Sequence, residues 1–319
     1  MREIDKIAFP GLGIEGFYID RTAFTVFGFE IKWYGIIIAF GLLMAMLYCV
    51  KTAKRFGLTS EDIFDAIIVG GPCCIIGSRL FYVLFSLEDF NSFYDVINIR
   101  DGGLALYGTV IMALIVAPIM CKVKKISLGS LFDMTAMGLL IGQFIGRWAN
   151  FVNREAYGSI TDLPWRMEIH NGLQRIQVHP TFLYESLWNV VGFILLHIYS
   201  KKRKFNGEVF LMYMAWYGFG RAMIEGLRSD SLMFFDFRIS QLLGIVFFVT
   251  SVILIFVFRR RQNNTLNEES AYTPLVRKTE AVEEQGDIVA VIEEQQSQPS
   301  KEDDRIVTTQ DNTDNMDNS

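Results

Sequence analysis

Seven blocks of mostly apolar residues dominate the first 260 positions of the chain. A helix needs ~20 apolar residues to cross ~30 Å of hydrocarbon. The blocks are Trp33–Val50, Ile63–Phe85, Leu104–Cys121, Leu128–Trp148, Pro180–Tyr199, Val209–Gly226 and Ile239–Phe258. Several contain small residues, as in the stripe Gly138, Gly142 and Gly146, which favours close contact between helices. The pattern predicts an all-α integral membrane protein with seven transmembrane helices.

Basic residues in the short connections predict the orientation of these helices. Lys and Arg follow the first, third, fifth and seventh blocks, whereas the alternate connections are mixed or acidic. Because cytoplasmic loops are enriched in Lys and Arg, we expect the N-terminus outside and the C-terminus inside. The one long outer connection, residues 149–179, has mixed polarity and several aromatic residues. We expect it to form a small extracytoplasmic cap.

The composition changes sharply after Arg261. The whole chain has a formal net charge of −5, but residues 262–319 hold 14 Asp and Glu against 4 Lys and Arg, a net −10. The first 261 residues are therefore mildly basic, at +5. A segment so polar and so poor in aromatic residues cannot bury enough apolar surface to fold. We expect residues 1–261 to form a seven-helix transmembrane domain and residues 262–319 to form an acidic, disordered cytoplasmic tail.

Three arginines lie inside the predicted transmembrane blocks, where charged residues are costly and are functional by default. Arg79, Arg147 and Arg221 fall in the later parts of the second, fourth and sixth blocks, each close to a glycine. These blocks run from inside to outside, so we expect all three arginines in the outer half of the membrane. The blocks that run the other way begin with polar residues at the same depth, namely Tyr34, Tyr107, Tyr184 and Glu185.

Two interpretations of these arginines are open. Arginines near helix ends can snorkel to the interface or pair with carboxylates such as Glu185 and Glu225. The convergence of three arginines at one depth instead favours a binding site, and Tyr217, Arg221 and Glu225 recur every four residues on one helix face. Guanidinium groups match phosphate oxygens bidentately and stay charged when buried. The pattern therefore predicts a site for an anionic phospholipid headgroup.

Such a site does not by itself distinguish an enzyme from a transporter, a seven-helix receptor or an intramembrane protease. A transporter would be expected to have an inverted repeat and interrupted helices near the midplane. The similar glycine–arginine stretches in the second, fourth and sixth blocks are too short to be such a repeat. A receptor is supported only by the number and orientation of the helices. The sequence contains neither a serine–histidine nor a paired-aspartate motif typical of an intramembrane protease.

The stretch GRWANFVNREAYG, at Gly146–Gly158, resembles the signature of the bacterial prolipoprotein diacylglyceryl transferases, GRWGNFxNxExxG. Four further stretches follow in the order of that family: WYG, RDGGLALYG, HPTFLYES and YGFGRAMIEGLR. Together they extend from Trp33 to Arg228. Ala149 replaces the usual glycine, which is a small change. We identify the chain by this resemblance as a member of the family.

The resemblance implies an enzyme of the bacterial plasma membrane. It would take phosphatidylglycerol from the outer leaflet and transfer the diacylglyceryl group to the lipobox cysteine thiol of a prolipoprotein signal peptide. Glycerol phosphate would be released, in the first step of lipoprotein maturation. The partners are then the lipid bilayer, this phospholipid and the signal peptide, with no nucleic acid, no metal and no organic cofactor.

The resemblance, together with the positions of polar residues in the predicted helices, gives the expected site residues. Arg147 is the signature arginine, which would contact the phosphate of the lipid. The residues expected to act in catalysis are Arg147, Arg221, Tyr107, Tyr34, Tyr217 and Glu185. The residues expected to bind phosphatidylglycerol are Arg147, Asn150, Asn153, Glu155, Gly158, Gly102, Gly103, Arg79 and His179.

The general base stays open. Tyr107 stands where many family members carry a histidine, and tyrosine with a pKa of ~10 is a poor base at neutral pH. We therefore expect Tyr107 to donate a hydrogen bond or to orient the lipid. His179 or Glu185 could take the thiol proton, or the thiol, with a pKa of ~8.5, could ionise on entering the positive field.

The interpretation of Tyr107 as a donor predicts a specific pattern in its variants. Tyr107→His should retain function because imidazole can also donate. Tyr107→Phe should lose roughly one charge-assisted hydrogen bond, or ~10- to 150-fold in rate. Turnover measured against pH should give parallel profiles for wild type and Tyr107→Phe. If a limb of the profile disappears in the variant, Tyr107 titrates in the mechanism and is a base.

Overall fold

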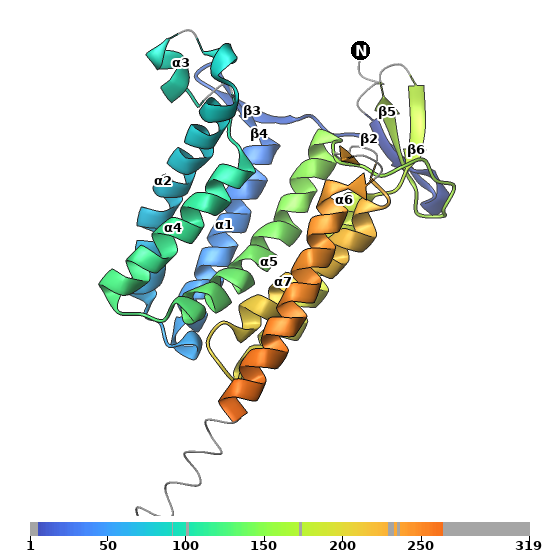
Figure 1. Ribbon diagram of the computed structural model, residues 1–319. Coiled ribbons are helices and arrows are strands. Elements are labelled where there is room, and N and C mark those ends of the chain that lie inside the picture. The colour runs from blue at the N-terminus through green and yellow to red at the C-terminus, as the bar shows by residue number, and fades with distance from the viewer. Residues whose placement is uncertain are drawn as a thin grey trace, which may run out of the picture. The chain divides into compact units, whose positions relative to one another are not determined.

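The predicted apolar blocks all form helices. The structure is a computed structural model that describes residues 6–90, 92–99, 102–171, 174–228, 233–234 and 237–263 (Figure 1). Its long helices are α1 (Trp33–Thr52), α2 (Ser60–Phe85), α4 (Leu106–Lys124), α5 (Leu128–Asn153), α6 (Thr181–Tyr199), α7 (Glu208–Glu225) and a last helix, Ile239–Asn263. The predicted mostly helical membrane protein is thus confirmed.

Six of these helices are long and apolar enough to cross a membrane, by length and composition. The exception is α7, which has 18 residues but carries Glu208, Arg221 and Glu225. Seven spans, rather than six, therefore stay a prediction. The predicted tail, residues 262–319, lies outside the described residues except for Gln262 and Asn263, which end the last helix.

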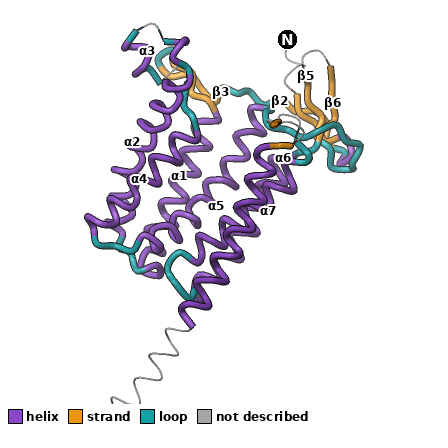
Figure 2. The backbone as a smooth tube through the Cα atoms, viewed as in Figure 1, coloured by secondary structure: helices purple, strands orange, loops and turns teal. Residues whose placement is uncertain are grey.

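Helix α5 is central to the bundle, because it packs against α1, α6 and α7, while α2 packs mainly against α4 (Figure 2). Two glycines bring α2 and α4 together. A Cβ on Gly77 would lie 2.5 Å from Cβ of Met112 and 2.9 Å from the carbonyl oxygen of Gly108. Only glycines allow this approach.

Helices α6 and α7 are joined by a reciprocal pair of tryptophans. The indole nitrogen of Trp188 donates to the carbonyl oxygen of Trp216 at 3.1 Å, and that of Trp216 donates to Trp188 at 3.0 Å. The rings stack with their centroids 4.1 Å apart. Gly192 and Gly220 provide the space, since a Cβ on either would collide with the opposite indole. The register of the two helices is therefore fixed.

Two buried carboxylates hold the start of α7. Asp133 accepts hydrogen bonds from the backbone N–H groups of Gly207 and Phe210, both at 2.9 Å, and pairs with Arg203 at 3.1 Å. Glu208 pairs with Arg259 of the last helix at 2.6 Å. Carboxylates at a helix N-terminus satisfy unpaired N–H groups and complement the helix dipole.

The predicted cap differs from the structure in two ways. Helix α5 continues to Asn153, so the first residues of the segment 149–179 are helical. The rest joins the N-terminal residues in an antiparallel sheet of order β2-β1-β5-β6, which the sequence did not predict. Its strands are β1 (Lys6–Phe9), β2 (Ile14–Tyr18), β5 (Met167–Asn171) and β6 (Gln174–Val178).

Smaller elements complete the described chain. The strands β3 (Thr22–Val26) and β4 (Phe29–Lys32) form a hairpin that leads into α1. The short helix α3 (Phe93–Ile97) lies between α2 and α4 in the sequence, and β7 (Met233–Phe234) pairs with β8 (Phe237–Arg238) before the last helix. The segments between the long helices therefore position the ends of α1, α4 and α7.

Candidate functional site

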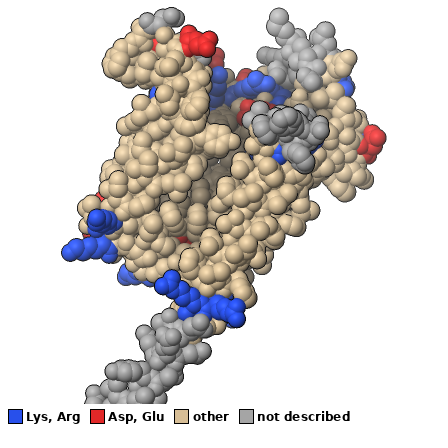
Figure 3. Space-filling view, viewed as in Figure 1, with Lys and Arg blue, Asp and Glu red and all other residues tan. Residues whose placement is uncertain are grey.

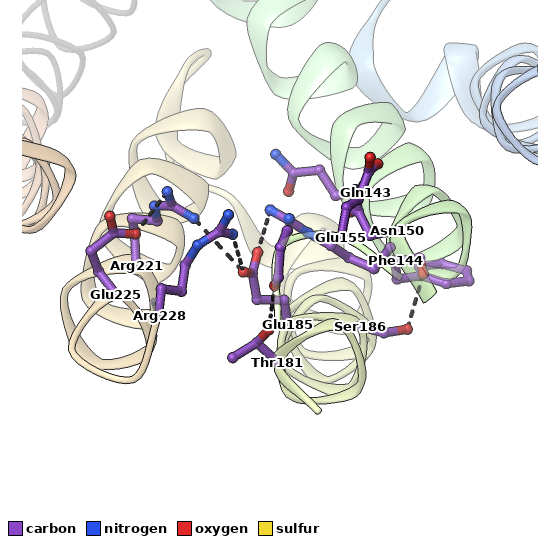
Figure 4. A network of polar contacts seen from close by, with 12 residues as sticks. Gln143, Phe144, Asn150, Glu155, Thr181, Glu185, Ser186, Arg221, Glu225 and Arg228 are labelled. Carbon is purple, nitrogen blue, oxygen red and sulfur yellow. Dashed lines mark hydrogen bonds and ion pairs between the residues drawn. The ribbon is translucent and has the colours of Figure 1, made fainter. Parts of the chain in front are cut away.

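A buried carboxylate, Glu185, lies at the centre of the candidate site. It is in the first turns of α6, and its side chain is 8% exposed. Three guanidinium groups converge on it (Figure 4). Arg147 pairs with Oε2, while Arg228 and Arg221 approach Oε1 at 3.2 and 3.7 Å. The structure thus brings together three residues that the sequence predicted, Arg147, Arg221 and Glu185, and adds a fourth.

The fourth residue, Arg228, follows the end of α7 and was absent from the predicted site. Backbone contacts hold it there: Gly158 forms a β-bridge with Arg228, and Ser159 N–H donates to the carbonyl oxygen of Leu227 at 2.7 Å. The sequence did contain a signal, because Arg228 stands in the matched stretch YGFGRAMIEGLR. Helical spacing could not find it, because it lies beyond the helix.

The cluster contains more arginines than carboxylates among the described residues. Arg221 also pairs with Glu225 at 2.7 Å, so three guanidinium groups face two carboxylates there. The arginine side chains are only 10–21% exposed. Charges at such partly desolvated positions interact more strongly than in water. The cluster can therefore bind an anion, and its planar donors suit phosphate oxygens.

The signature residues after Arg147 fold into a tight loop. The side-chain amides of Asn150 and Asn153 donate to Oε1 of Glu155, at 2.9 and 3.4 Å. Arg154 and Ala156 adopt positive φ angles of 56° and 55°, which non-glycine residues rarely do. The three polar side chains thus bind one another and shape the end of α5. Contact of Asn150, Asn153 and Glu155 with the lipid stays a prediction.

Gly158 closes this loop against the start of α6. Its N–H donates to the carbonyl oxygen of His179 at 3.0 Å, and a Cβ at this position would lie 2.6 Å from Cβ of His179. Nδ1 of His179 lies 3.2 Å from the hydroxyl of Tyr184, which accepts a hydrogen bond from Trp165 at 2.7 Å. Burial lowers the pKa of His179 from its ordinary value, which favours the neutral form of the ring.

Arg79 belongs to a different cluster, on α2. Its guanidinium group donates to five backbone carbonyl oxygens at 2.6–2.9 Å, those of Asp95, Val96, Asn98, Gly102 and Gly103. Gly102 and Gly103 have positive φ angles of 94° and 74°, and a Cβ on Gly103 would collide with Arg79. Since all five donors of an arginine are engaged, these contacts fix the segment before α4. A direct role of the three residues in lipid binding stays a prediction.

The three predicted tyrosines lie in different surroundings. The side chain of Tyr217 stacks on Tyr213 with centroids 5.9 Å apart, one turn before Arg221. Tyr34 lines a groove described below. Tyr107, in the first turn of α4, is 57% exposed and lies near Phe81. Among the described residues, no hydrogen bond or ion pair joins Tyr107 to the arginine cluster.

An apolar groove of about 590 Å³ leads to Arg147 along α1, α2 and α5. The molecule is visibly hollowed between α4 and the last helix (Figure 3). Apolar residues line most of the groove, including Ile38, Met46 and Leu139, while Arg147 and Asn150 lie at one end. Gly142 leaves open space, since a Cβ there would meet nothing within 4 Å. The groove suits a hydrocarbon chain, and the arginine suits its charged head.

Fold and site together define a helical integral membrane protein with an arginine cluster at the end of an apolar groove. The family model described as "Prolipoprotein diacylglyceryl transferase" matches residues 21–257. The chain belongs to this family, and the resemblance seen in the sequence is confirmed.

Several curated relatives extend over most of the chain. They share the name phosphatidylglycerol–prolipoprotein diacylglyceryl transferase. The protein of Finegoldia magna is 40% identical over 245 residues, which are 76% of this chain and 97% of the relative. That of Clostridioides difficile is 37% identical over 252 residues, 79% of this chain and all of the relative. A protein of Clostridium perfringens is 43% identical over 248 residues, 74% of this chain and 95% of the relative.

The close packing of Gly158 predicts that a methyl group there is harmful. Gly158→Ala should lower the free energy of unfolding by about 1–3 kcal/mol, the usual effect of overpacking. It should also reduce activity, because the added methyl group would displace Arg228. Gly71→Ala, on α2, is a matched control because a Cβ there meets nothing within 4 Å. Thermal unfolding in detergent would test both. Equal stability of the two variants would contradict the proposed packing of the signature loop.

Proposed function

We propose that this chain transfers the diacylglyceryl group of phosphatidylglycerol to the cysteine thiol of a prolipoprotein lipobox. Membership of the family supports this reaction. The single structural observation that carries it is the position of Arg147, which ends the apolar groove and also joins the cluster around Glu185. An amphiphile could place its acyl chains in the groove and its phosphate at the arginines.

The reaction forms one bond and breaks one. The cysteine sulfur attacks the glycerol carbon that bears the phosphate, a C–S bond forms, and the C–O bond breaks with its electron pair going to the phosphate oxygen. The products are a thioether and glycerol phosphate, and the thiol proton passes to a base or to solvent. Negative charge grows on the leaving phosphate, where preorganised cations contribute most. We assign that role to Arg147 and Arg221, with Arg228 as a third cation.

We assign Glu185 a positioning role and not that of the base. Both of its carboxylate oxygens already face guanidinium groups, so its lone pairs hold arginines in place. Removal of one partner from a buried ion pair leaves an uncompensated charge. Burial lowers the pKa of His179 and so favours the neutral ring that a base requires, but no contact in the described structure directs its other nitrogen to the cluster.

We further propose seven spans, with the N-terminus outside, the C-terminus inside and the site in the outer-leaflet half of the bacterial plasma membrane. On the face shown in Figure 3, Lys and Arg gather at the end of the bundle where the last helix ends. Lys124 of α4, Arg203 before α7 and Arg259 of the last helix contribute basic groups after odd-numbered spans. The excess of basic residues on the inner side supports this orientation.

The proposed reaction can be tested with purified protein. Phosphatidylglycerol labelled in its acyl chains and a peptide with a lipobox cysteine should give a labelled thioether peptide and an equal amount of glycerol phosphate. The same peptide with serine in place of cysteine should give none. Release of glycerol phosphate without labelled peptide, or no release at all, would refute the transferase reaction.

The role of Arg147 predicts the behaviour of its variants. Arg147→Ala and Arg147→Lys should both lower turnover by roughly 10²-fold or more, because lysine keeps the charge but not the planar fork. Membrane insertion should survive in both. Arg175→Lys is a control, since Arg175 lies in strand β6, outside the arginine cluster, and its side chain is 57% exposed. Wild-type turnover of Arg147→Lys would show that the planar geometry is not needed.

A further inference from the structure

One polar side chain beside the arginine cluster has no part in the reaction described so far. Gln143 lies on α5 one helical turn before Arg147 and lines the same groove. Its side-chain nitrogen donates to the hydroxyl of Tyr213 at 2.8 Å. Its carbonyl oxygen, Oε1, is buried and has no hydrogen-bond partner among the described residues. An unpaired buried oxygen is costly, which points to a partner supplied by a ligand.

The position of Gln143 places this oxygen next to the proposed phosphate site. Residues four apart on a helix share one face and lie about 6 Å apart along the axis. Figure 4 shows the Gln143 amide directed from α5 towards α7, on the side of Arg221 and Glu185. Tyr213, which accepts the hydrogen bond from Gln143, stacks on Tyr217, one turn before Arg221. Gln143 is thus a polar residue of the groove wall that lies between Arg147 and α7.

The arginines of the cluster provide no hydrogen-bond acceptor for a hydroxyl group of the ligand. Arg147, Arg221 and Arg228 carry only hydrogen-bond donors, which suit the phosphate oxygens. The glycerol headgroup of phosphatidylglycerol carries two hydroxyl groups, which also need acceptors. Both oxygens of Glu185 face guanidinium groups, and Oε2 of Glu225 forms an ion pair with Arg221 at 2.7 Å. Among the groove-lining residues that the structure describes, Gln143 supplies the buried oxygen without a partner.

We propose that Oε1 of Gln143 accepts a hydrogen bond from a hydroxyl of the glycerol headgroup, and that Gln143 is thereby a specificity residue for phosphatidylglycerol. The inference rests on the proposed function. The phosphate then marks a branch point. Its acyl arm extends along the apolar part of the groove beside α1, and its glycerol arm reaches Oε1 of Gln143, one turn from Arg147. A site built to bind a hydroxyl rejects an analogue that lacks it, because a buried polar group is then left unpaired.

The test compares two lipids in two proteins. Phosphatidylpropanol has the same phosphate and acyl chains as phosphatidylglycerol but no headgroup hydroxyl. For wild type, we expect kcat/KM to be roughly 5- to 150-fold higher with phosphatidylglycerol. Leucine has a volume similar to that of glutamine. In Gln143→Leu the ratio should fall to near one, because kcat/KM should decrease with phosphatidylglycerol and change little with phosphatidylpropanol.

Two further variants keep the test decisive. Thr135→Val is the matched control, because Thr135 lines the groove on the same helix but already donates to the carbonyl oxygen of Leu131 at 2.8 Å; its lipid ratio should equal that of wild type. If Gln143→Leu does not fold, the double variant Gln143→Leu/Tyr213→Phe removes both ends of that hydrogen bond and leaves no hydroxyl unpaired.

Three results would overturn the proposal. A wild-type ratio near one would show that the headgroup hydroxyls are not recognised. An unchanged ratio in Gln143→Leu would assign the recognition to another residue. An equal loss with both lipids would place Gln143 in folding or in binding of the peptide. Absence of transfer from either lipid by wild-type protein is a different outcome, since it would refute the proposed function and not this residue's role within it.

Discussion

The burial of charge among apolar helices is the constraint on which the rest of this structure depends. A charged group in such surroundings needs a partner, and Glu185 has three, on α5, on α7 and after α7. Each pair constrains where two helices can end. Two other contacts also restrict how the helices pack. The glycines between α2 and α4 and the tryptophan pair between α6 and α7 each fix the register of their two helices. The cluster is therefore both a packing element and a site.

The two ends of the bundle use the same kinds of charge differently. Near the start of α7, Asp133 and Glu208 are completely buried, and each carboxylate binds backbone N–H groups and an arginine. These groups satisfy one another and stabilise the helix N-terminus. At the other end, three arginines exceed the two carboxylates they contact. Of these two arrangements, the second has more arginines than carboxylates among the described residues, which suits the binding of an anion.

The parts of the fold that depend on local sequence could be predicted, and the parts that depend on distant contacts could not. Each apolar block became a helix, because hydropathy over about 20 residues is a local property. Strand β1 pairs with β5, with Ala8 opposite Glu168. Nothing in the sequence of either short strand identifies the other as its partner. Arg228 was missed for a similar reason, since the Gly158 backbone holds it.

The candidate site shows the same division. Helix direction and position in the blocks placed Arg147, Arg221 and Glu185 at one depth, and in the structure both arginines form ion pairs with Glu185. The sequence could not distinguish a guanidinium that is open to a ligand from one that is engaged. Arg79 resembled the other two in its glycine-rich surroundings, yet its five donors bind the carbonyl oxygens that precede α4.

The separation between Tyr107 and the arginine cluster is consistent with the geometry of the proposed displacement. A nucleophile that attacks a saturated carbon must approach opposite the leaving oxygen. If the phosphate is anchored at Arg147 on the side of α6 and α7, the sulfur must come from the side of α1, α2 and α4, across the groove (Figure 1). Tyr107 lies in the first turn of α4 on that side, and the hydrogen bonds of Arg79 hold the backbone that precedes this helix. Under the proposed function, the arginines act on the departing phosphate, and a role of Tyr107 on the incoming peptide or the glycerol backbone stays a prediction.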